Sequence, residues 1–193
     1  MKMEKLLGIV EALGTNVLEG YNINSLARLA KIDVATTYRT LKEMEMKNEV
    51  VKSKKGNNVF YRINLSNTTA LKYCELASIE KRKRFLIKHP EMINLAAKAG
   101  KPVDVMLLFG SMARDEKKPK DIDLLLICEG RPDAAAAEVF GGKASPILMG
   151  RDEFVKKMRE RNGVVANMLR DGVLLRGEDV FWKIVRSGVG YES

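Results

Sequence analysis

The sequence is poor in the side chains that bind zinc or form disulfides, with only two cysteines and one histidine in 193 residues. Cys74 and Cys128 lie far apart and belong to no Cys-x-x-Cys or Cys/His cluster, so the sequence predicts no zinc site. We expect both to be buried thiols in a reducing cytoplasm. No Asp, Ser or Cys pattern accompanies His89, which we expect to be a loop or cap residue rather than a catalyst.

Long apolar runs are also missing, since none approaches the roughly 20 residues that a membrane-spanning helix needs. Glu4 and Glu11 interrupt the apolar residues near the N-terminus, whose spacing is helical, and this argues against a signal peptide. The sequence is 46% hydrophobic and 31% charged, which is typical of a globular protein and not of a disordered one. We therefore expect a cytoplasmic protein of one or two domains that makes no contact with membranes.

The net charge of +9 favours an anionic partner, and nucleic acid is the first candidate. Many basic proteins bind no nucleic acid, however, so the charge alone does not decide the question. The motifs along the chain are more specific.

The most informative stretch is residues 103–127, in which an apolar run, a Gly-Ser turn and a charged loop precede a second apolar run. Asp121 and Asp123 open the second run, and because side chains alternate along a strand, both should point to the same side. Two such carboxylates repel each other unless a cation lies between them, and their hard oxygens suit Mg²⁺. Gly110 lets the backbone approach a ligand, and a helix starting after Ser111 would direct its positive end to an anion. This combination predicts a site for a nucleoside triphosphate.

The segments FGSMAR and DID together resemble the Gly-Ser…Asp-x-Asp signature of the polymerase β-like nucleotidyltransferase superfamily, in its minimal form. The resemblance implies that the Gly-Ser turn grips the triphosphate and that the paired aspartates hold Mg²⁺ or Mn²⁺ and carry catalysis. Carried over to this sequence, the phosphate-binding residues are Gly110, Ser111 and Arg114, and the metal-binding and catalytic residues are Asp121 and Asp123.

The sequence departs from that family pattern in three places. Asp115 stands where a glycine is usual, and Lys120 stands where a serine often precedes the first aspartate. Active members usually carry a third carboxylate on the next strand, and Ser145 occupies that position here. Asp152 and Glu153 follow at a predicted helix start, where we expect them to favour the helix dipole, with a reach to the metal as the alternative. Turnover of a substrate is therefore left open by the sequence.

Residues 1–65 carry the spacing of three helices followed by a hairpin. The first helix should end at Gly14, a short second helix should begin after Asn24 as its N-cap, and the third should run from about Val34 to Lys47. On the third helix we expect an inner face of Val34, Thr37, Tyr38, Leu41 and Met44, and an outer face of Ala35, Thr36, Arg39, Thr40 and Glu43.

Two β-rich segments flank KKGNN, whose Gly and Asn predict a hairpin turn. With the helices, this pattern resembles a winged helix-turn-helix domain, which implies that the third helix enters a DNA groove and that hairpin lysines meet phosphates. The expected contacts with double-stranded DNA come from Thr36, Arg39, Thr40, Lys52, Lys54, Lys55 and Arg62. The alternative use of such a domain is dimerisation or protein contact, and three acids count against a strongly basic DNA surface: Glu43, Glu45 and Glu49.

The predicted fold class is α+β or α/β, in three parts. Residues 1–65 form the winged helix-turn-helix domain, residues 66–100 a helical connector, and residues 101–193 a small nucleotidyltransferase-like domain. In the last part we expect a mixed sheet flanked by helices, with a helix over about residues 130–142, a third strand over 143–149 and a helix over about 151–169.

The main hypothesis is thus a DNA-binding nucleotidyltransferase that moves a nucleoside monophosphate from a Mg-nucleoside triphosphate to a hydroxyl acceptor. The alternative is a DNA-binding transcription regulator, in which the second domain is a degenerate nucleotide sensor or a module that binds a cognate partner protein, as in toxin–antitoxin pairs. Winged-helix proteins often act as dimers on paired half-sites, so a homodimer is a further expectation.

Overall fold

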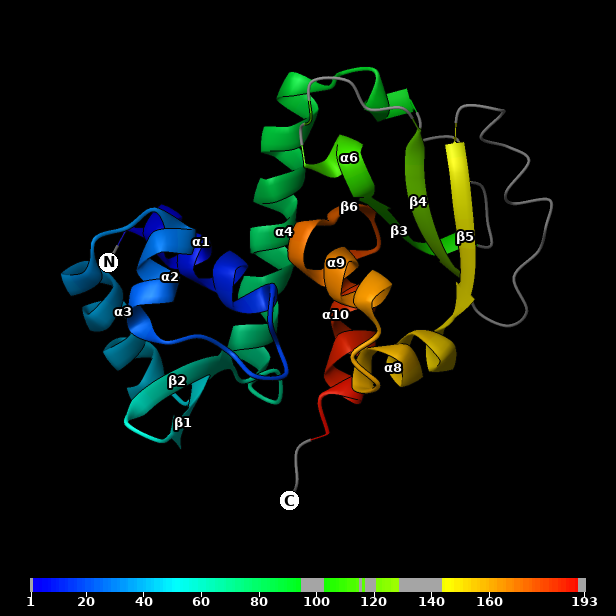
Figure 1. Cartoon of the computed structure of the whole chain (residues 1–193). Helices are drawn as coiled ribbons and strands as arrows, with labels where there is room; N and C mark the ends of the chain where they lie inside the picture. Colours follow the sequence, from blue (N-terminus) through cyan, green and yellow to red (C-terminus); the bar gives the residue numbers. More distant parts are fainter. Residues whose placement is uncertain (1, 95–102, 115, 117–120, 129–143, 191–193) are drawn as a thin grey trace. The chain divides into compact units, whose positions relative to one another are not determined.

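The computed structural model describes residues 2–94, 103–114, 116, 121–128 and 144–190. The chain forms two compact units (Figure 1): the first comprises residues 1–77 with 189–193, and the second comprises residues 78–188. Each unit combines helices with one small β-sheet, which confirms an α+β class. Within the described residues, no helix is long and apolar enough to cross a membrane.

Residues 2–65 of the first unit fold into three helices and a hairpin. The elements are α1 (Met3–Gly14), α2 (Ile23–Ala30), α3 (Val34–Met46), β1 (Val50–Lys55) and β2 (Asn58–Ile63). The two strands pair antiparallel, and Gly56 turns the chain between them at a φ of +59°. The helices and the hairpin turn predicted from the sequence are therefore confirmed.

Side-chain caps fix where the second and third helices begin. Asn22 accepts a hydrogen bond from the backbone N–H of Ser25 at 2.9 Å, and Asp33 accepts one from Thr36 at 2.7 Å. Asparagine and aspartate are favoured here because their side chains satisfy a backbone N–H that has no partner within the helix. The prediction of Asn24 as the cap of α2 is wrong, because Asn22 caps this helix and Asn24 lies inside it.

Helix α4 (Thr68–Lys88) contributes residues to both units, because the division between the units falls within it. Asn67 caps this helix and accepts hydrogen bonds from Thr69 at 2.9 Å and from Ala70 at 3.0 Å. The helical connector predicted over residues 66–100 is therefore confirmed over Thr68–Lys88. Its last six residues, 95–100, lie outside the described residues.

The second unit is built on a four-stranded mixed sheet. Its strands are β3 (Val103–Phe109), β4 (Ile122–Cys128), β5 (Ala144–Gly150) and β6 (Val173–Arg176). Their order in space is β5-β4-β3-β6, with β4 antiparallel to β3 and parallel to β5, and with β6 antiparallel to β3. The third strand predicted over residues 143–149 corresponds to β5. The helix predicted over residues 130–142 lies outside the described residues.

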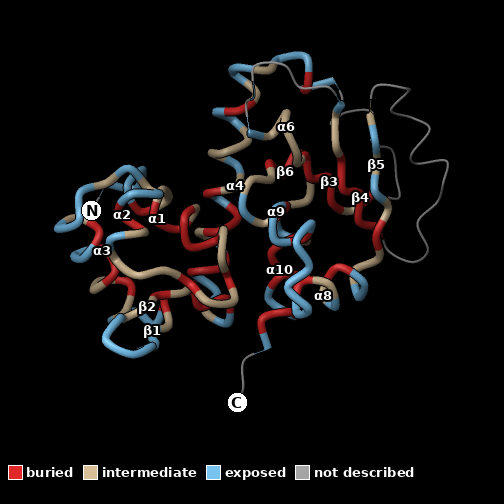
Figure 2. Tube along the Cα trace, viewed as in Figure 1, coloured by how far each residue is buried: buried red, intermediate tan, exposed pale blue. Residues whose placement is uncertain are grey.

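The central strands are buried along almost their whole length (Figure 2), which explains why they are continuous apolar runs in the sequence. One face packs against Phe85 of α4 through Met106, Leu108, Leu124 and Leu126. Three further helices contact β3 or β5: α8 (Arg151–Arg159), α9 (Gly163–Asp171) and α10 (Glu178–Gly188). The single helix predicted over about residues 151–169 is therefore wrong, since α8 and α9 share that range.

Candidate functional site

The glycine of the Gly-Ser turn and the second aspartate meet at one end of the sheet. Phe109, the last residue of β3, pairs with Asp123 of β4, so Gly110 comes next to the Asp123 carboxylate. Gly110 adopts a φ of +75°, and a Cβ at this position would collide with Oδ2 of Asp123. The left-handed backbone favours glycine here, and any side chain would also displace the Asp123 carboxylate. The fold thus joins two motifs that a charged loop separates in the sequence.

Asp121 and Asp123 form a pair of interacting carboxylates. The pKa of Asp123 is raised, first by burial and then by the charge of Asp121, while the guanidinium of Arg114 opposes this rise. Asp121 is exposed and Asp123 is half-buried, so an ion from solvent can reach both. A divalent cation would relieve their repulsion, and carboxylate oxygens are ligands that Mg²⁺ prefers. The donor set therefore fits a hard divalent cation.

Strand β5 adds a hydroxyl to this pair rather than a carboxylate. Ser145 pairs with Asp123 in the parallel register and is exposed. Asp152 and Glu153 lie in the first turn of α8, beyond the far end of β5, which at about 3.3 Å per residue is roughly 20 Å along the strand from Ser145. The alternative that one of them reaches the metal is therefore wrong. Among the described residues, no group of three or more His, Cys, Asp or Glu side chains could hold a metal ion.

The Gly-Ser turn opens only a single turn of helix. Helix α6 (Gly110–Ala113) starts at Gly110 itself, not after Ser111 as predicted, and contains four residues. So short a helix builds little dipole, because the macrodipole sums aligned peptide units over several turns. The backbone approach at Gly110 and the positive charge of Arg114 are therefore the stronger features for holding a phosphate.

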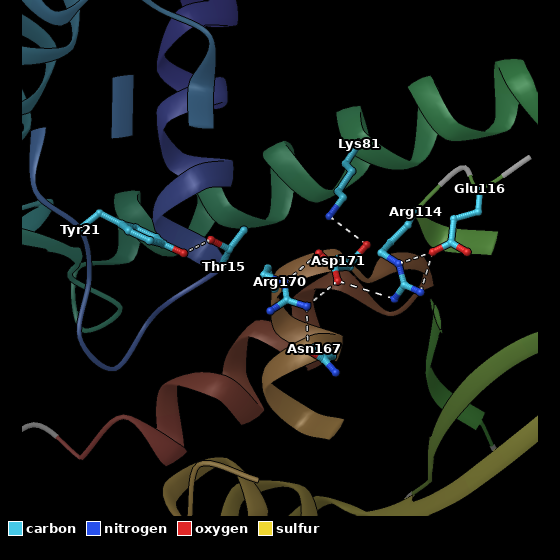
Figure 3. Close-up of polar contacts among 8 residues, drawn as sticks. All are labelled: Thr15, Tyr21, Lys81, Arg114, Glu116, Asn167, Arg170 and Asp171. Atoms are coloured by element: carbon cyan, nitrogen blue, oxygen red, sulfur yellow. Dashed lines mark hydrogen bonds and ion pairs between the residues drawn. The ribbon is translucent and has the colours of Figure 1, made fainter. Parts of the chain in front are cut away.

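Arg114 lies in a cluster of opposite charges beside this turn (Figure 3). Its Nε and Nη2 contact Oε1 of Glu116 at 2.8 and 2.7 Å, and its Nη1 lies 4.0 Å from Oδ2 of Asp171. Arg170 contacts the same carboxylate of Asp171 at 3.0 Å, and Lys81 donates to the Asp171 carbonyl at 3.4 Å. These contacts connect Arg114 to α9, with two arginines on the carboxylates of Glu116 and Asp171 and Lys81 on the backbone carbonyl of Asp171.

Asp171 was not among the site residues predicted from the sequence. Asp171 is the last residue of α9 and comes close to Arg114 only because α9 packs against α6. Two of the three departures from the pattern that the sequence resembles, Asp115 and Lys120, lie outside the described residues.

In the first unit, the outer face of α3 differs from the predicted one. Thr40 is 2% exposed and Thr37 is 0% exposed, whereas Val34 and Tyr38 are 49% and 47% exposed. The prediction of Thr40 as a DNA contact is therefore wrong. Burial costs Thr37 little, because its hydroxyl donates a hydrogen bond to the backbone carbonyl of Asp33 at 3.0 Å.

The other predicted DNA contacts lie on the surface of the first unit. Arg39 is exposed, and its Nη2 donates to Oγ1 of the half-buried Thr36 at 3.4 Å. In the hairpin, the exposed residues are Lys52, Lys54 and Lys55, and Arg62 is half-buried. These side chains are accessible to a phosphate backbone, as the prediction requires.

Acidic neighbours offset part of this positive charge. Lys52 lies 3.5 Å from Glu45, and Lys55 lies 3.7 Å from Glu19. By contrast, Glu49 is only 4% exposed, so it does not reach the surface that was expected to meet DNA. Burial raises the pKa of the Glu49 carboxyl.

No family model matches the chain, and comparisons with curated proteins and with solved structures find no match. The candidate functions therefore rest on the geometry described above and on the motifs of the sequence.

Proposed function

We propose that the second unit binds a Mg-nucleoside triphosphate and transfers its nucleoside monophosphate to a hydroxyl acceptor. The observation that carries this proposal is the close approach of Gly110 to Asp123, which joins the Gly-Ser turn to the pair of carboxylates. A triphosphate needs both features, because its oxygens require donors or cations and its charge requires a divalent ion.

Each residue has its own role in the proposed reaction. Asp121 and Asp123 hold the divalent cation, which offsets phosphate charge when it is bound. Gly110 and Ser111 bring the backbone close to the leaving phosphates, and Arg114 adds a positive charge beside them. The acceptor oxygen forms a bond to the α-phosphorus as the bond to the bridging oxygen breaks, and pyrophosphate leaves. Such transfer depends on positioning and electrostatics.

The proposal is tested with nucleotides labelled at the α-phosphate, Mg²⁺, and protein, nucleic-acid and small hydroxyl acceptors. We expect labelled acceptor with the wild-type protein and none after Asp121→Ala plus Asp123→Ala. Asp152→Ala is the matched control, because it removes an exposed carboxylate beyond the other end of β5. Absence of labelling with every nucleotide, or labelling that survives the double substitution, contradicts the transferase proposal.

The second candidate function is a DNA-binding transcription regulator in which the nucleotide site acts as a sensor. Ser145 favours it, because a hydroxyl in place of a carboxylate leaves few ligands for a second catalytic ion. The exposed Arg39 and hairpin lysines of the first unit also suit contacts with phosphates. Gel shifts on genomic fragments at several salt concentrations test it, since phosphate contacts make affinity fall steeply with salt. No shift on any fragment at low salt contradicts it.

A further inference from the structure

A row of three side chains crosses the sheet at the candidate site. Phe109, Asp123 and Ser145 are paired across the adjacent strands β3, β4 and β5, so their side chains project from the same face. Neighbouring strands lie about 4.8 Å apart, which brings the Ser145 hydroxyl beside the Asp123 carboxylate. Asp121 lies in the bend directly before β4, two positions from Asp123.

The end of β5 that carries Ser145 is open to solvent. Strand β5 is an edge strand of the described sheet, and Ser145 is exposed. Farther along the same face of β5, Ile147 is 38% exposed and Met149 is 3% exposed, so the strand is covered only toward α8. The hydroxyl can therefore turn toward a ligand of Asp123 without disturbing the core.

We propose that Oγ of Ser145 supplies the third protein oxygen to the divalent cation held by Asp121 and Asp123, an inference that rests on the proposed function. Serine and threonine hydroxyls are known ligands of Mg²⁺ in phosphate-binding loops. A neutral hydroxyl adds a hard oxygen without adding to the repulsion between the carboxylates. Two carboxylates balance the charge of one divalent ion, so serine at this position suits a single-ion site, whereas a carboxylate would favour two ions.

The metal preference of the protein shows whether Ser145 coordinates the ion or only lies near it. The full-length wild type and its Ser145→Ala, Ser145→Thr and Ser145→Cys variants are titrated calorimetrically with Mg²⁺ and with Cd²⁺, without nucleotide. We expect Ser145→Ala to weaken Mg²⁺ binding about tenfold, and Ser145→Thr to restore it because threonine keeps the hydroxyl. Ser145→Cys should raise the preference for Cd²⁺ over Mg²⁺ by about tenfold or more, because sulfur ligands select soft cations.

The control variant introduces a cysteine outside the candidate site. Ser53→Cys, at an exposed serine of β1 in the first unit, should leave both affinities unchanged. The role of Ser145 is refuted if wild type and Ser145→Ala bind Mg²⁺ equally and Ser145→Cys gains no preference for Cd²⁺. This holds even if Asp123→Asn abolishes Mg²⁺ binding, because that result concerns the aspartates alone. A wild-type protein that binds no Mg²⁺, or binds it equally after Asp121→Asn plus Asp123→Asn, overturns the proposed site and this inference with it.

Discussion

Gly110 and Asp123 occupy adjoining space at the end of the sheet, so a side chain on the first must displace the second. Gly110→Ala adds a Cβ and also holds an alanine at a φ of +75°. We expect the free energy of unfolding to fall by about 1–3 kcal/mol and Mg²⁺ binding to weaken, as measured by urea denaturation and calorimetry. Gly163→Ala is the control, because a Cβ there meets nothing within 4 Å. Unchanged Mg²⁺ binding in Gly110→Ala would contradict this account.

The charge of Asp123 should destabilise the metal-free protein, because burial and Asp121 raise its pKa. The folded protein then keeps the Asp123 proton to a higher pH than the unfolded chain does. The destabilisation is therefore absent at low pH and develops as the pH rises above the ordinary aspartate range. We expect Asp123→Asn to raise the free energy of unfolding at pH 7 by less than about 1 kcal/mol, because the site is partly exposed, and to raise the Tm accordingly. The further rise in Tm that Mg²⁺ gives the wild type should be absent in this variant. A lower Tm, or a retained response to Mg²⁺, would count against the site.

Glu49 offers a parallel test in the first unit, because its side chain is 4% exposed and burial raises its pKa. The folded state binds the Glu49 proton more tightly than the unfolded state, so stability is lost as the pH rises above the ordinary glutamate range. Glu49→Gln should raise the free energy of unfolding at pH 7 by about 1 kcal/mol. The gain should shrink as the pH is lowered. Urea denaturation of Glu49→Gln that shows the same gain at every pH would refute this explanation.

At the residue scale, the parts of the candidate site that the sequence could predict were those carried by short motifs. The resemblance of the Gly-Ser and Asp-x-Asp segments to the nucleotidyltransferase signature predicted that Gly110 and Asp123 lie together, as they do. The same resemblance assigned Ser145 to the next strand, and the register of β4 and β5 places it beside Asp123. The approach of Asp171 to Arg114 could not be predicted, because it depends on how α9 packs against α6, and no spacing in the sequence encodes that distance.

At the scale of elements, α3 shows how the period of a helix can outweigh side-chain polarity. The buried stripe consists of Thr37, Thr40, Leu41 and Met44, which follow the i, i+3, i+4, i+7 pattern, while Tyr38 faces outward. A threonine can enter such a stripe because it presents a methyl group and can bond its hydroxyl to the preceding turn. A tyrosine has a polar tip and tolerates exposure. The predicted inner face was therefore right for Thr37, Leu41 and Met44 and wrong for Val34 and Tyr38, and Thr40 was wrongly placed on the outer face.

DNA binding should accordingly depend on Arg39 and not on Thr40. Arg39→Ala removes an exposed cation, so we expect weaker binding and a slope of log affinity against log salt that is smaller by about 1. Thr40→Val keeps the shape of a buried side chain and should leave DNA affinity unchanged. Gel shifts at several salt concentrations measure both effects. The opposite pattern would show that the outer face of α3 has been assigned wrongly.

The break between α8 and α9 could have been predicted from the sequence, whereas the order of the strands in the sheet could not. Arg161 adopts a φ of +55°, and Asn162 caps α9 by accepting hydrogen bonds from Val164 at 3.0 Å and Val165 at 3.4 Å. An Asn-Gly pair is a known breaker, so a single helix across it was a poor prediction. The order β5-β4-β3-β6, however, depends on contacts between distant segments, which local patterns do not contain.

At the scale of the whole molecule, one chain carries two units with different surface chemistry. The first unit exposes Arg39 and three hairpin lysines, whereas the second pairs two carboxylates at the end of a sheet. The net charge of +9 could indicate an anionic partner, but it could not say which unit binds it. The proposed ligand belongs to the second unit, which we propose binds a nucleoside triphosphate through a divalent cation.

Calorimetric titration of the full-length protein with a non-hydrolysable nucleoside triphosphate, with and without Mg²⁺, tests that claim most directly. We expect binding that requires Mg²⁺, weakens about tenfold or more in Asp123→Asn, and is unchanged in Asp152→Asn, whose carboxylate lies beyond the other end of β5. Binding of equal strength without Mg²⁺, equal loss in both variants, or no binding of any nucleoside triphosphate would contradict it.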